Sequence, residues 1–397
     1  MKKSLLSIIS ILLIAAFALT ACAPAAPAAT AAPAAAPITV TFWHAYGTGS
    51  AEEAALTKVL AQAAIDMPQY KINVLQIPFA DIFNKYRTDV AAGSGPDMFV
   101  APNDSLGDDA RAGMIADITS LSKDKLTGVS QLGIDGMTLD GKLYGIPESL
   151  KALTLWYNKS MMPTPPKTWD DVLKAMQAGT PISLNYGCYQ VYGLYTAFGG
   201  NIFDAKWKVV ADQGGVVDTF KFLNTAYQVQ KKAGWAMNDS DGLAPFSEGK
   251  LAAIMNGNWA MADYKKGLGD KLATVQLPAG PSGVSKPMLG VDGYYINPNS
   301  KNKEAAIAVA LYLSNAKSQT TMMNEAGHVP VRTDVTITDP LIKSLVDAFN
   351  VGATVRPQVK QLGNYWSNFC SSDSIFEKGI DPAKFVTDAT TAANKAP

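Results

Sequence analysis

Histidine is scarce in this chain, which has two, His44 and His328, among 397 residues. Zinc sites commonly use several histidines, and many hydrolases place one beside their nucleophile, so the scarcity argues against both kinds of site. The chain also lacks an excess of either charge, with 34 basic and 34 acidic residues. We therefore expect no nucleic-acid partner.

The short motifs of common enzyme classes are missing as well. The sequence contains no G-x-S-x-G elbow, no P-loop and no HExxH helix. Carboxylates are numerous, but no pair of them lies in a frame typical of a secreted glycoside hydrolase, which is the weakest of the alternatives. We expect a protein that is not an enzyme and that uses neither a metal nor a cofactor.

The first 21 residues have the pattern of a secretory signal peptide. Two lysines follow Met1, and the apolar run from Leu5 to Leu19 is shorter than the roughly 20 residues that a spanning helix needs. The sequence LTAC at 19–22 resembles the lipobox of bacterial lipoproteins, which implies cleavage before Cys22 and a diacylglycerol on its thiol. Two acyl chains anchor a protein stably. An ordinary secretion signal with a chance cysteine is the alternative.

Residues 22–37 are predicted to be a linker. After Cys22, the segment 23–37 consists of ten alanines, four prolines and one threonine. It has too few large apolar side chains to fold, and its prolines favour an extended chain of up to about 45 Å at ~3.1 Å per residue. We expect this tether to hold the folded part at the outer face of the cytoplasmic membrane.

The chain from residue 38 onward alternates strand and helix patterns. Strands are predicted at 38–43, 70–77 and 97–101, separated by helices at 51–65 and 80–92. This alternation is typical of an α/β layer with parallel strand pairing. Further segments continue the pattern, with two strands within 142–156, strands at 272–277 and 288–297, and helices at 168–177, 216–232, 302–316, 340–350 and 382–394.

Five segments carry a resemblance to one protein family. They are VAAGSGPDMFVAPND (90–104), DGKLYGIPESLKALTLWYNKSMMPTPPKTWDDV (140–172), FSEGKLAAIMNGNWAM (246–261), SKPMLGVDGYYIN (285–297) and GHVPVRTDV (327–335). Together they resemble the extracellular solute-binding proteins of ABC importers, in the maltose- and maltodextrin-binding branch. The segments occur in the family's order and span nearly all of the mature chain.

The resemblance implies an α/β fold of the two-lobed periplasmic-binding-protein type, each lobe a sheet flanked by helices, joined by a hinge. Lobe 1 would comprise 38–150 and 294–338, and lobe 2 would comprise 151–293 and 339–397. An oligosaccharide of the maltose or maltodextrin type would bind between the lobes. The protein would act as a monomer and deliver this carbohydrate ligand to the importer's permease subunits.

A sugar site needs flat aromatic rings for the C–H face of the sugar and polar groups for its hydroxyl rim. The resemblance places Trp259 and Trp366 at stacking positions, Tyr189 in the cleft and Asp104 at a sugar-binding position. Helix capping for Asp104 and helix packing for Trp366 are the alternatives, and Trp43 fits a core position equally well. The complete candidate set is Trp43, His44, Tyr46, Asp104, Lys151, Tyr189, Trp259 and Trp366.

The chain departs from the maltodextrin branch at several cleft positions. Lys151 and Gly187 stand where the branch has glutamates, and the stretch 101–105 lacks its tryptophan and arginine. These changes alter the hydrogen-bond polarity around a ligand. The second alternative is a binding protein for a phosphorylated small molecule such as a glycerol phosphate ester. That ligand needs converging cations, and Lys151 is the only evident one in the predicted cleft.

Cys188 and Cys370 remain once Cys22 is assigned to the lipid. Disulfides persist outside the cytoplasm. The resemblance puts Tyr189 and Trp366 on the same side of the cleft, and Cys370 follows Trp366 by four residues, so the two sulfurs are candidates for a disulfide. Two separate buried thiols are the alternative.

Overall fold

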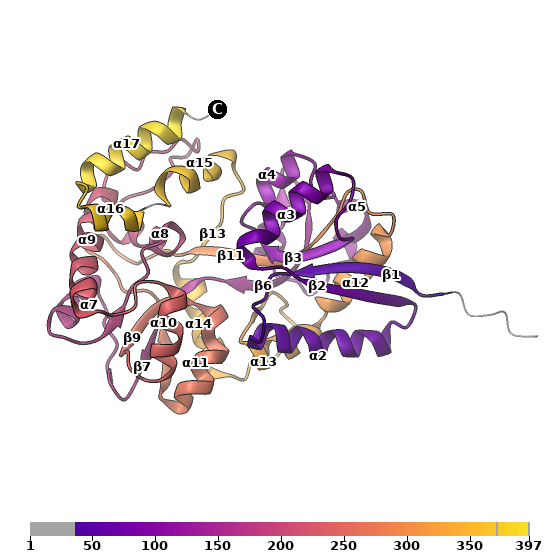
Figure 1. Cartoon of the computed structure of the whole chain (residues 1–397), viewed down its shortest axis with the longest axis horizontal. Coiled ribbons are helices and arrows are strands. Elements are labelled where there is room, and N and C mark those ends of the chain that lie inside the picture. Colours follow the sequence, from indigo (N-terminus) through magenta and orange to yellow (C-terminus); the bar gives the residue numbers. More distant parts are fainter. Residues whose placement is uncertain (1–35, 371, 396–397) are drawn as a thin grey trace, which may run out of the picture. The chain divides into compact units, whose positions relative to one another are not determined.

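The computed structural model describes residues 36–370 and 372–395 (Figure 1). The predicted signal peptide (1–21), Cys22 and almost all of the predicted linker lie outside the described residues. The residues from Pro37 onward form one compact unit. None of the described helices is long and apolar enough to cross a membrane.

A seven-stranded sheet combines strands from distant parts of the chain, in the order β12-β6-β11-β3-β1-β2 with β13 beside β11. The first strand pairs in parallel with the second and the third, as the strand–helix alternation predicts. In contrast, β11 runs antiparallel to β3 and β6. The strands are β1 (Ile38–His44), β2 (Tyr70–Gln76), β3 (Met98–Pro102), β6 (Gly145–Lys151), β11 (Met288–Ile296), β12 (Val329–Pro330) and β13 (Thr354–Val355).

Helices α2 (Ala51–Asp66), α3 (Phe79–Ala91), α12 (Lys303–Leu313) and α13 (Ala316–Ala326) accompany this large sheet. Helix α2 begins where the Ser50 side chain accepts a hydrogen bond from the Glu53 backbone, which satisfies one of the free N–H groups at the helix start. It packs against α12 and α13. The helices predicted at 51–65 and 80–92 are confirmed to within about a residue at each end.

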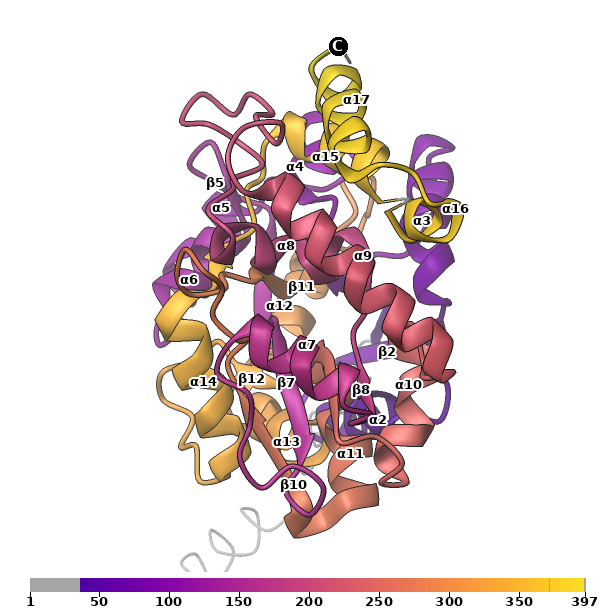
Figure 2. The same ribbon diagram turned by 90° about the vertical axis from the view of Figure 1, so that its left-hand side faces the viewer.

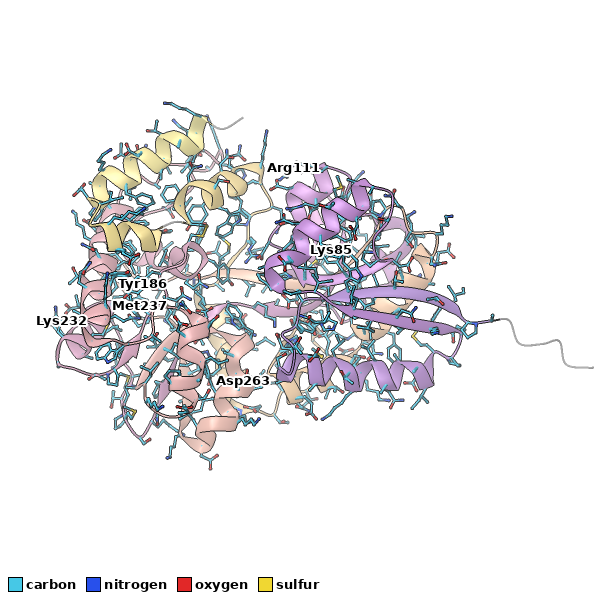
Figure 3. The ribbon with its side chains drawn as sticks, viewed as in Figure 1. Lys85, Arg111, Tyr186, Lys232, Met237 and Asp263 are labelled. Atoms are coloured by element: carbon cyan, nitrogen blue, oxygen red, sulfur yellow. A yellow bond between two sulfur atoms is a disulfide. The ribbon has the colours of Figure 1, made fainter. Side chains whose placement is uncertain are left out.

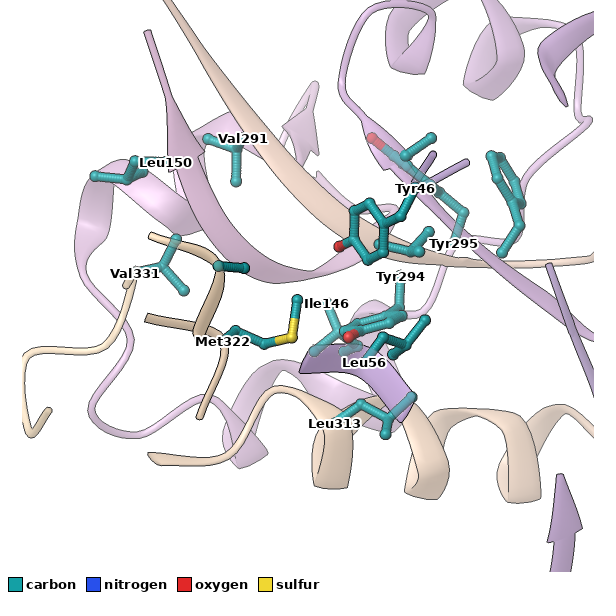
Figure 4. Close-up of a cluster of buried hydrophobic side chains, with 14 of the residues drawn as sticks. Tyr46, Leu56, Ile146, Leu150, Val291, Tyr294, Tyr295, Leu313, Met322 and Val331 are labelled. Atoms are coloured by element: carbon teal, nitrogen blue, oxygen red, sulfur yellow. The ribbon is translucent and has the colours of Figure 1, made fainter. Parts of the chain in front are cut away.

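The core of the large sheet is rich in aromatic and branched side chains. Figure 4 shows Tyr294 of β11 beside Leu56 of α2, Leu313 of α12 and Met322 of α13. All nine residues of β11 are buried. Apart from Asp292, β11 consists of apolar residues and glycines, the pattern of a strand covered on both faces, which is why it could be predicted from its sequence.

A second sheet has four strands in the order β10-β7-β9-β8. Its strands are β7 (Leu153–Asn158), β8 (Ile182–Ser183), β9 (Ala253–Gly257) and β10 (Leu272–Val275). Figure 2 shows α7 (Trp169–Gln177), α8 (Cys188–Ala197) and α9 (Val216–Ala233) gathered on the side that faces the viewer. The Thr168 and Asp171 side chains form a capping box at the start of α7, where the sequence predicted a helix.

The chain passes from one sheet to the other at closely defined points. Strand β6 ends at Lys151 and β7 begins at Leu153, so Ala152 alone separates the two sheets there. The predicted boundary between 293 and 294 falls inside β11, whose residues from Met288 onward all pair within the large sheet. The chain therefore passes from the second sheet to the large sheet between β10 and β11, before Met288, and not in the middle of a strand.

The remaining helices of the second half are α10 (Asp239–Ser247), α11 (Met261–Leu268), α14 (Pro340–Gly352), α15 (Lys360–Phe369), α16 (Ser372–Lys378) and α17 (Pro382–Lys395). The sequence predicted α14 and α17 but not α8, α10, α11 or α15. Helix α8 is rich in tyrosine, which has high strand propensity, and α10 contains Pro245, which disfavours a helix interior. Tertiary packing outweighs these local preferences.

Candidate functional site

A cavity of about 720 Å³ lies between elements of the two sheets. The large-sheet side supplies residues from the loop after β1, from α2, α3 and β11, and from the end of β3. The other side supplies residues from α8, α10 and α15. The residues that line it are Ala45, Tyr46, Glu52, Phe79, Ala80, Phe83, Asn84, Arg87, Val100, Ala101, Pro102, Asp104, Ser105, Lys151, Cys188, Tyr189, Gln190, Asp239, Trp259, Gly290, Asp292, Arg356 and Trp366.

The structure brings six of the eight candidate binding residues to this cavity. They are Tyr46, Asp104, Lys151, Tyr189, Trp259 and Trp366. These residues are spread over 321 positions of the chain, from 46 to 366. The two exceptions are Trp43 and His44.

Trp43 and His44 are buried side chains at the end of strand β1, whose last residue is His44. Trp43 is 8% exposed, and Lys85 of α3, labelled in Figure 3, holds its ammonium 4.9 Å from the centre of the indole ring. The His44 ring lies between those of Phe42 and Tyr46. The cavity begins one residue later, at Ala45.

Three aromatic side chains form what we call the aromatic wall: Tyr189, Trp259 and Trp366. Each is partly exposed. The rings of Tyr189 and Trp259 are 6.3 Å apart, and the Tyr189 hydroxyl donates a hydrogen bond to the Met288 carbonyl at 3.1 Å. Rings held in this way present flat apolar surfaces to the cavity without having to order when a ligand arrives.

A disulfide between Cys188 and Cys370 joins the two helices that carry Tyr189 and Trp366. The Cα atoms of the two cysteines are 4.6 Å apart, although 182 positions separate them in sequence. The Tyr365 hydroxyl reinforces the junction by donating to the Cys188 carbonyl at 2.8 Å. Helices α8 and α15 are therefore fixed to each other directly behind the aromatic wall.

Five charged side chains form a second feature, which we call the charged row: Glu148, His328, Glu52, Lys151 and Asp292. His328 Nδ1 lies 3.0 Å from both carboxylate oxygens of Glu148, and its Nε2 lies 2.8 Å from Glu52 Oε1. Lys151 Nζ lies 2.6 Å from Glu52 Oε1 and 3.4 Å from Asp292 Oδ2. Glu52, Lys151 and Asp292 line the cavity, whereas Glu148 and His328 support them from behind.

Burial and mutual attraction compete at each member of the charged row. Burial raises the pKa of Glu52, but Lys151 and His328 outweigh it and hold this pKa at about 2. Burial lowers the pKa of His328, but Glu148 outweighs it and raises this pKa to about 9. At Asp292 burial prevails over the attraction of Lys151, and the pKa rises to about 6. At neutral pH the row therefore alternates in sign from Glu148 to Asp292.

Arg356 connects the two sides of the cavity. Its Nη1 donates to Asp104 Oδ1 and, at 3.2 Å, to Asn103 Oδ1, both in the segment after β3. Its guanidinium carbon lies 5.2 Å from the centre of the Tyr189 ring. Burial lowers the pKa of Arg356 to about 9. Asp104 is not a helix cap, since α4 (Leu106–Arg111) begins after Ser105.

Sequence reasoning missed several charged residues of the cavity. Arg356 follows the short strand β13, outside any motif, and Asp292 lies within a buried strand that shows only its apolar pattern. Glu52 occupies the first turn of α2, where an acidic residue is common for helix-dipole reasons alone. The expectation of Lys151 as the only evident cation was wrong, because Arg87 and Arg356 also line the cavity.

Each of the three cations in the cavity lining already has an acidic partner. Arg87 Nε lies 2.6 Å from Asp109 Oδ1, Lys151 pairs with Glu52, and Arg356 pairs with Asp104. Among the described residues, no group of three or more histidine, cysteine, aspartate or glutamate side chains is placed to hold a metal ion. The cavity thus combines apolar rings with polar and charged groups, among them four acids and three cations.

Comparison with known proteins gives the family. The sequence pattern of the family described as bacterial extracellular solute-binding protein matches residues 58–350. A galactooligosaccharide-binding protein of Bacillus subtilis (strain 168) is 26% identical over 81% of this chain and 82% of its own length. A maltodextrin-binding protein of the same organism is 27% identical over 77% of this chain and 78% of its own length.

A solved structure has the same architecture. The maltotriose-binding protein of Thermus thermophilus, bound with maltotriose, superposes with a TM-score of 0.78 and 25% identity. The superposition covers 90% of this chain and 99% of that one. The α/β fold expected from the sequence is thereby confirmed.

Proposed function

Because the chain belongs to the bacterial extracellular solute-binding protein family, we propose that it binds an oligosaccharide of the maltodextrin type in the cavity and delivers it to the permease of an ABC importer. Members of this family bind their solutes and do not transform them, so the chain is not an enzyme. We propose further that two lobes, built around the two sheets, close over the sugar by a hinge motion.

The observation that carries this proposal is the pairing of the aromatic wall with polar groups around it. Tyr189, Trp259 and Trp366 offer flat surfaces for the C–H faces of sugar rings. The carboxylates of Asp104 and Asp239 and the amide of Gln190 line the same cavity and can bond hydroxyl groups. A stacking contact contributes about 0.5–1.5 kcal/mol beyond area burial, so micromolar affinity, about −8 kcal/mol, needs several such contacts.

The relatives support the same class of ligand. Two of them are named for binding galactooligosaccharide and maltodextrin, and the superposed structure holds maltotriose. A cavity of about 720 Å³ lies within the roughly 300–1,000 Å³ range of small-molecule sites.

A phosphoester fits this cavity less well than a sugar. Phosphate recognition relies on charge-assisted hydrogen bonds from arginine and lysine, which must be free to turn toward the ligand. Here Arg87, Lys151 and Arg356 each lie against a carboxylate. A phosphate would have to displace those acids, at a cost that a neutral sugar avoids.

Isothermal titration of the purified protein tests this function. The panel contains maltose, maltotriose, a galactooligosaccharide and glycerol phosphate esters. We expect at least one di- or trisaccharide to bind with micromolar affinity and the phosphoesters not to bind. Sugar affinities no tighter than millimolar, together with tight binding of another ligand class, would show that the proposal is wrong.

We also propose that a lipid on Cys22 anchors the protein at the outer face of the cytoplasmic membrane. The support is the lipobox-like LTAC sequence and the alanine- and proline-rich segment that follows it. In cells that express the protein, Cys22→Ala should move it from the membrane fraction to the soluble extracytoplasmic fraction. Membrane association that is unchanged in this variant would contradict the anchor.

A further inference from the structure

The charged row has one more acid than it has cations. Glu148, Glu52 and Asp292 are acidic, while His328 and Lys151 are the two bases. All five side chains are at most 17% exposed. Buried charges are costly unless they are paired, so the third acid of the row is stabilised by a proton or by hydrogen-bond donors of a ligand.

Asp292 is the acid that is left over. Glu148 has His328 at 3.0 Å, and Glu52 has both His328 at 2.8 Å and Lys151 at 2.6 Å. Among the described residues, the ion pairs give Asp292 only Lys151, at 3.4 Å, and that ammonium lies closer to Glu52. Asp292 also lines the cavity, whereas Glu148 does not. The excess charge therefore resides where a ligand can reach it.

We propose that Asp292 couples sugar binding to the release of a proton, because its carboxylate accepts hydrogen bonds from the hydroxyl groups of the bound sugar. This inference rests on the proposed function, and it assigns to Asp292 a direct part in recognition. The sugar hydroxyls add donors to a carboxylate whose ion-pair partner, among the described residues, is Lys151 alone. The proton that had neutralised Asp292 leaves to solvent.

The surroundings of Asp292 identify the group that titrates. It faces Lys151 and Glu148 of β6, Glu52 of α2 and His328 before β12, with tyrosine hydroxyls nearby. Burial is the main cause of the raised pKa of Asp292, about 6, and Glu148 adds to it while Lys151 opposes it. Glu52, with a pKa of about 2, and His328, with a pKa of about 9, both stay charged between pH 5 and pH 8.

The sign of the effect follows from linkage. Hydroxyl donors stabilise the ionised carboxylate, so the pKa of Asp292 is lower in the complex than in the free protein. Below pH 6 binding must first remove the proton. The affinity therefore falls as the pH falls, by about tenfold between pH 8 and pH 5, and about half a proton is released per sugar bound at pH 6.

Titration calorimetry with maltotriose tests this coupling. Measurements at pH 6 in two buffers of different ionisation enthalpy give the number of protons released, and dissociation constants at pH 5 and pH 8 give the affinity change. We expect proton release and an affinity change of about tenfold in the wild type, and neither in Asp292→Asn. The wild-type measurement stands even if the variant does not fold, which thermal melting would reveal.

Asp239 is the rival source of a proton, because it lines the cavity and burial raises its pKa too. Loss of proton release in Asp239→Asn, with its retention in Asp292→Asn, would overturn the inference. Maltotriose binding by the wild type without proton release would do the same while leaving the proposed function intact. Failure of the wild type to bind any sugar of the panel at pH 8 would overturn the proposed function and this inference together.

Discussion

The aromatic wall and the charged row line the same cavity but are held in place by different forces. Tyr189 and Trp366 lie on helices that a disulfide joins, and apolar packing surrounds them. The five members of the charged row are held by one another, through contacts of 2.6 to 3.4 Å between opposite charges. We therefore expect the fold to tolerate the loss of one ring of the wall and to depend on each member of the row.

This difference predicts opposite responses to substitution. Removal of a ring from the aromatic wall should lower the affinity for ligand but change the free energy of unfolding little, because the core behind the ring stays packed. A charge removed from a buried row leaves its partner unpaired, and the penalty falls on the folded state. Four predictions probe the contrast, from the largest expected effect to the smallest.

Lys151→Met should lower the free energy of unfolding by about 3–5 kcal/mol, because it leaves Glu52 and Asp292 buried without their shared cation. Urea unfolding measures the change. Lys174→Met is the matched control, since Lys174 is 70% exposed and pairs with Asp170 on the surface of α7. We expect the control to unfold at the wild-type urea concentration. Equal stability of Lys151→Met and the wild type would show that the row does not support the fold.

Loss of the disulfide should reduce stability by about 2–4 kcal/mol, because the bond closes a loop of 182 positions in the unfolded chain. The double variant Cys188→Ala and Cys370→Ala should match the wild type measured in reductant, and reductant should not change the variant further. Alkylation of the unreduced, denatured wild type should label neither cysteine. Two labelled thiols would contradict the bond.

Stability should fall as the pH rises from 6.5 to 9.5. The pKa of His328 is about 9 in the folded state against 6.5 for an unperturbed histidine, so its contribution is full below pH 6.5 and is lost as the pH passes 9. The loss amounts to at most about 3 kcal/mol. Thermal or urea unfolding across this range measures it.

His328→Gln should remove most of this alkaline loss. His44→Gln should retain the alkaline loss of stability, because burial lowers the pKa of His44 and places its titration below the range from pH 6.5 to 9.5. An equal slope in wild type and His328→Gln would show that another group causes the dependence.

Trp259→Ala and Trp366→Ala should each weaken sugar binding by at least tenfold, about 1.4 kcal/mol, with little change in melting temperature. Trp207→Ala is the control: this tryptophan is 43% exposed and lies outside the cavity lining. Calorimetry with the sugar that binds best gives the affinities. A large drop in melting temperature with unchanged affinity would assign Trp259 and Trp366 to packing.

The fold and the aromatic wall could be predicted because both leave local signals. The first three strands and two helices follow regular apolar spacing, and Trp259 lies in the short pattern NGNW at 256–259. The capping box of α7 is equally local, since Thr168 and Asp171 are three residues apart. Patterns of this kind can be recognised within one short segment, without knowledge of tertiary contacts.

The charged row leaves no such signal. Its members occur at positions 52, 148, 151, 292 and 328, and only Glu148 and Lys151 are near one another in sequence. Whether an acidic side chain is exposed or buried beside a cation depends on tertiary contacts. Trp43 shows the converse: a strand-end tryptophan suits a core or a site equally well until its neighbours are known.

Arg356 makes the width of the cavity a measurable quantity. Arg356 contacts Asp104, which follows β3, and the ring of Tyr189, which lies on α8. A motion that separates β3 from α8 must therefore break one of these two contacts. If the guanidinium leaves Asp104, that carboxylate loses a full positive charge at contact distance. If it leaves Tyr189, the positive charge beside this ring is lost, and the surroundings of the neighbouring Trp259 indole change as well. Tyrosine and tryptophan fluorescence therefore provides an internal gauge of opening that needs no attached label.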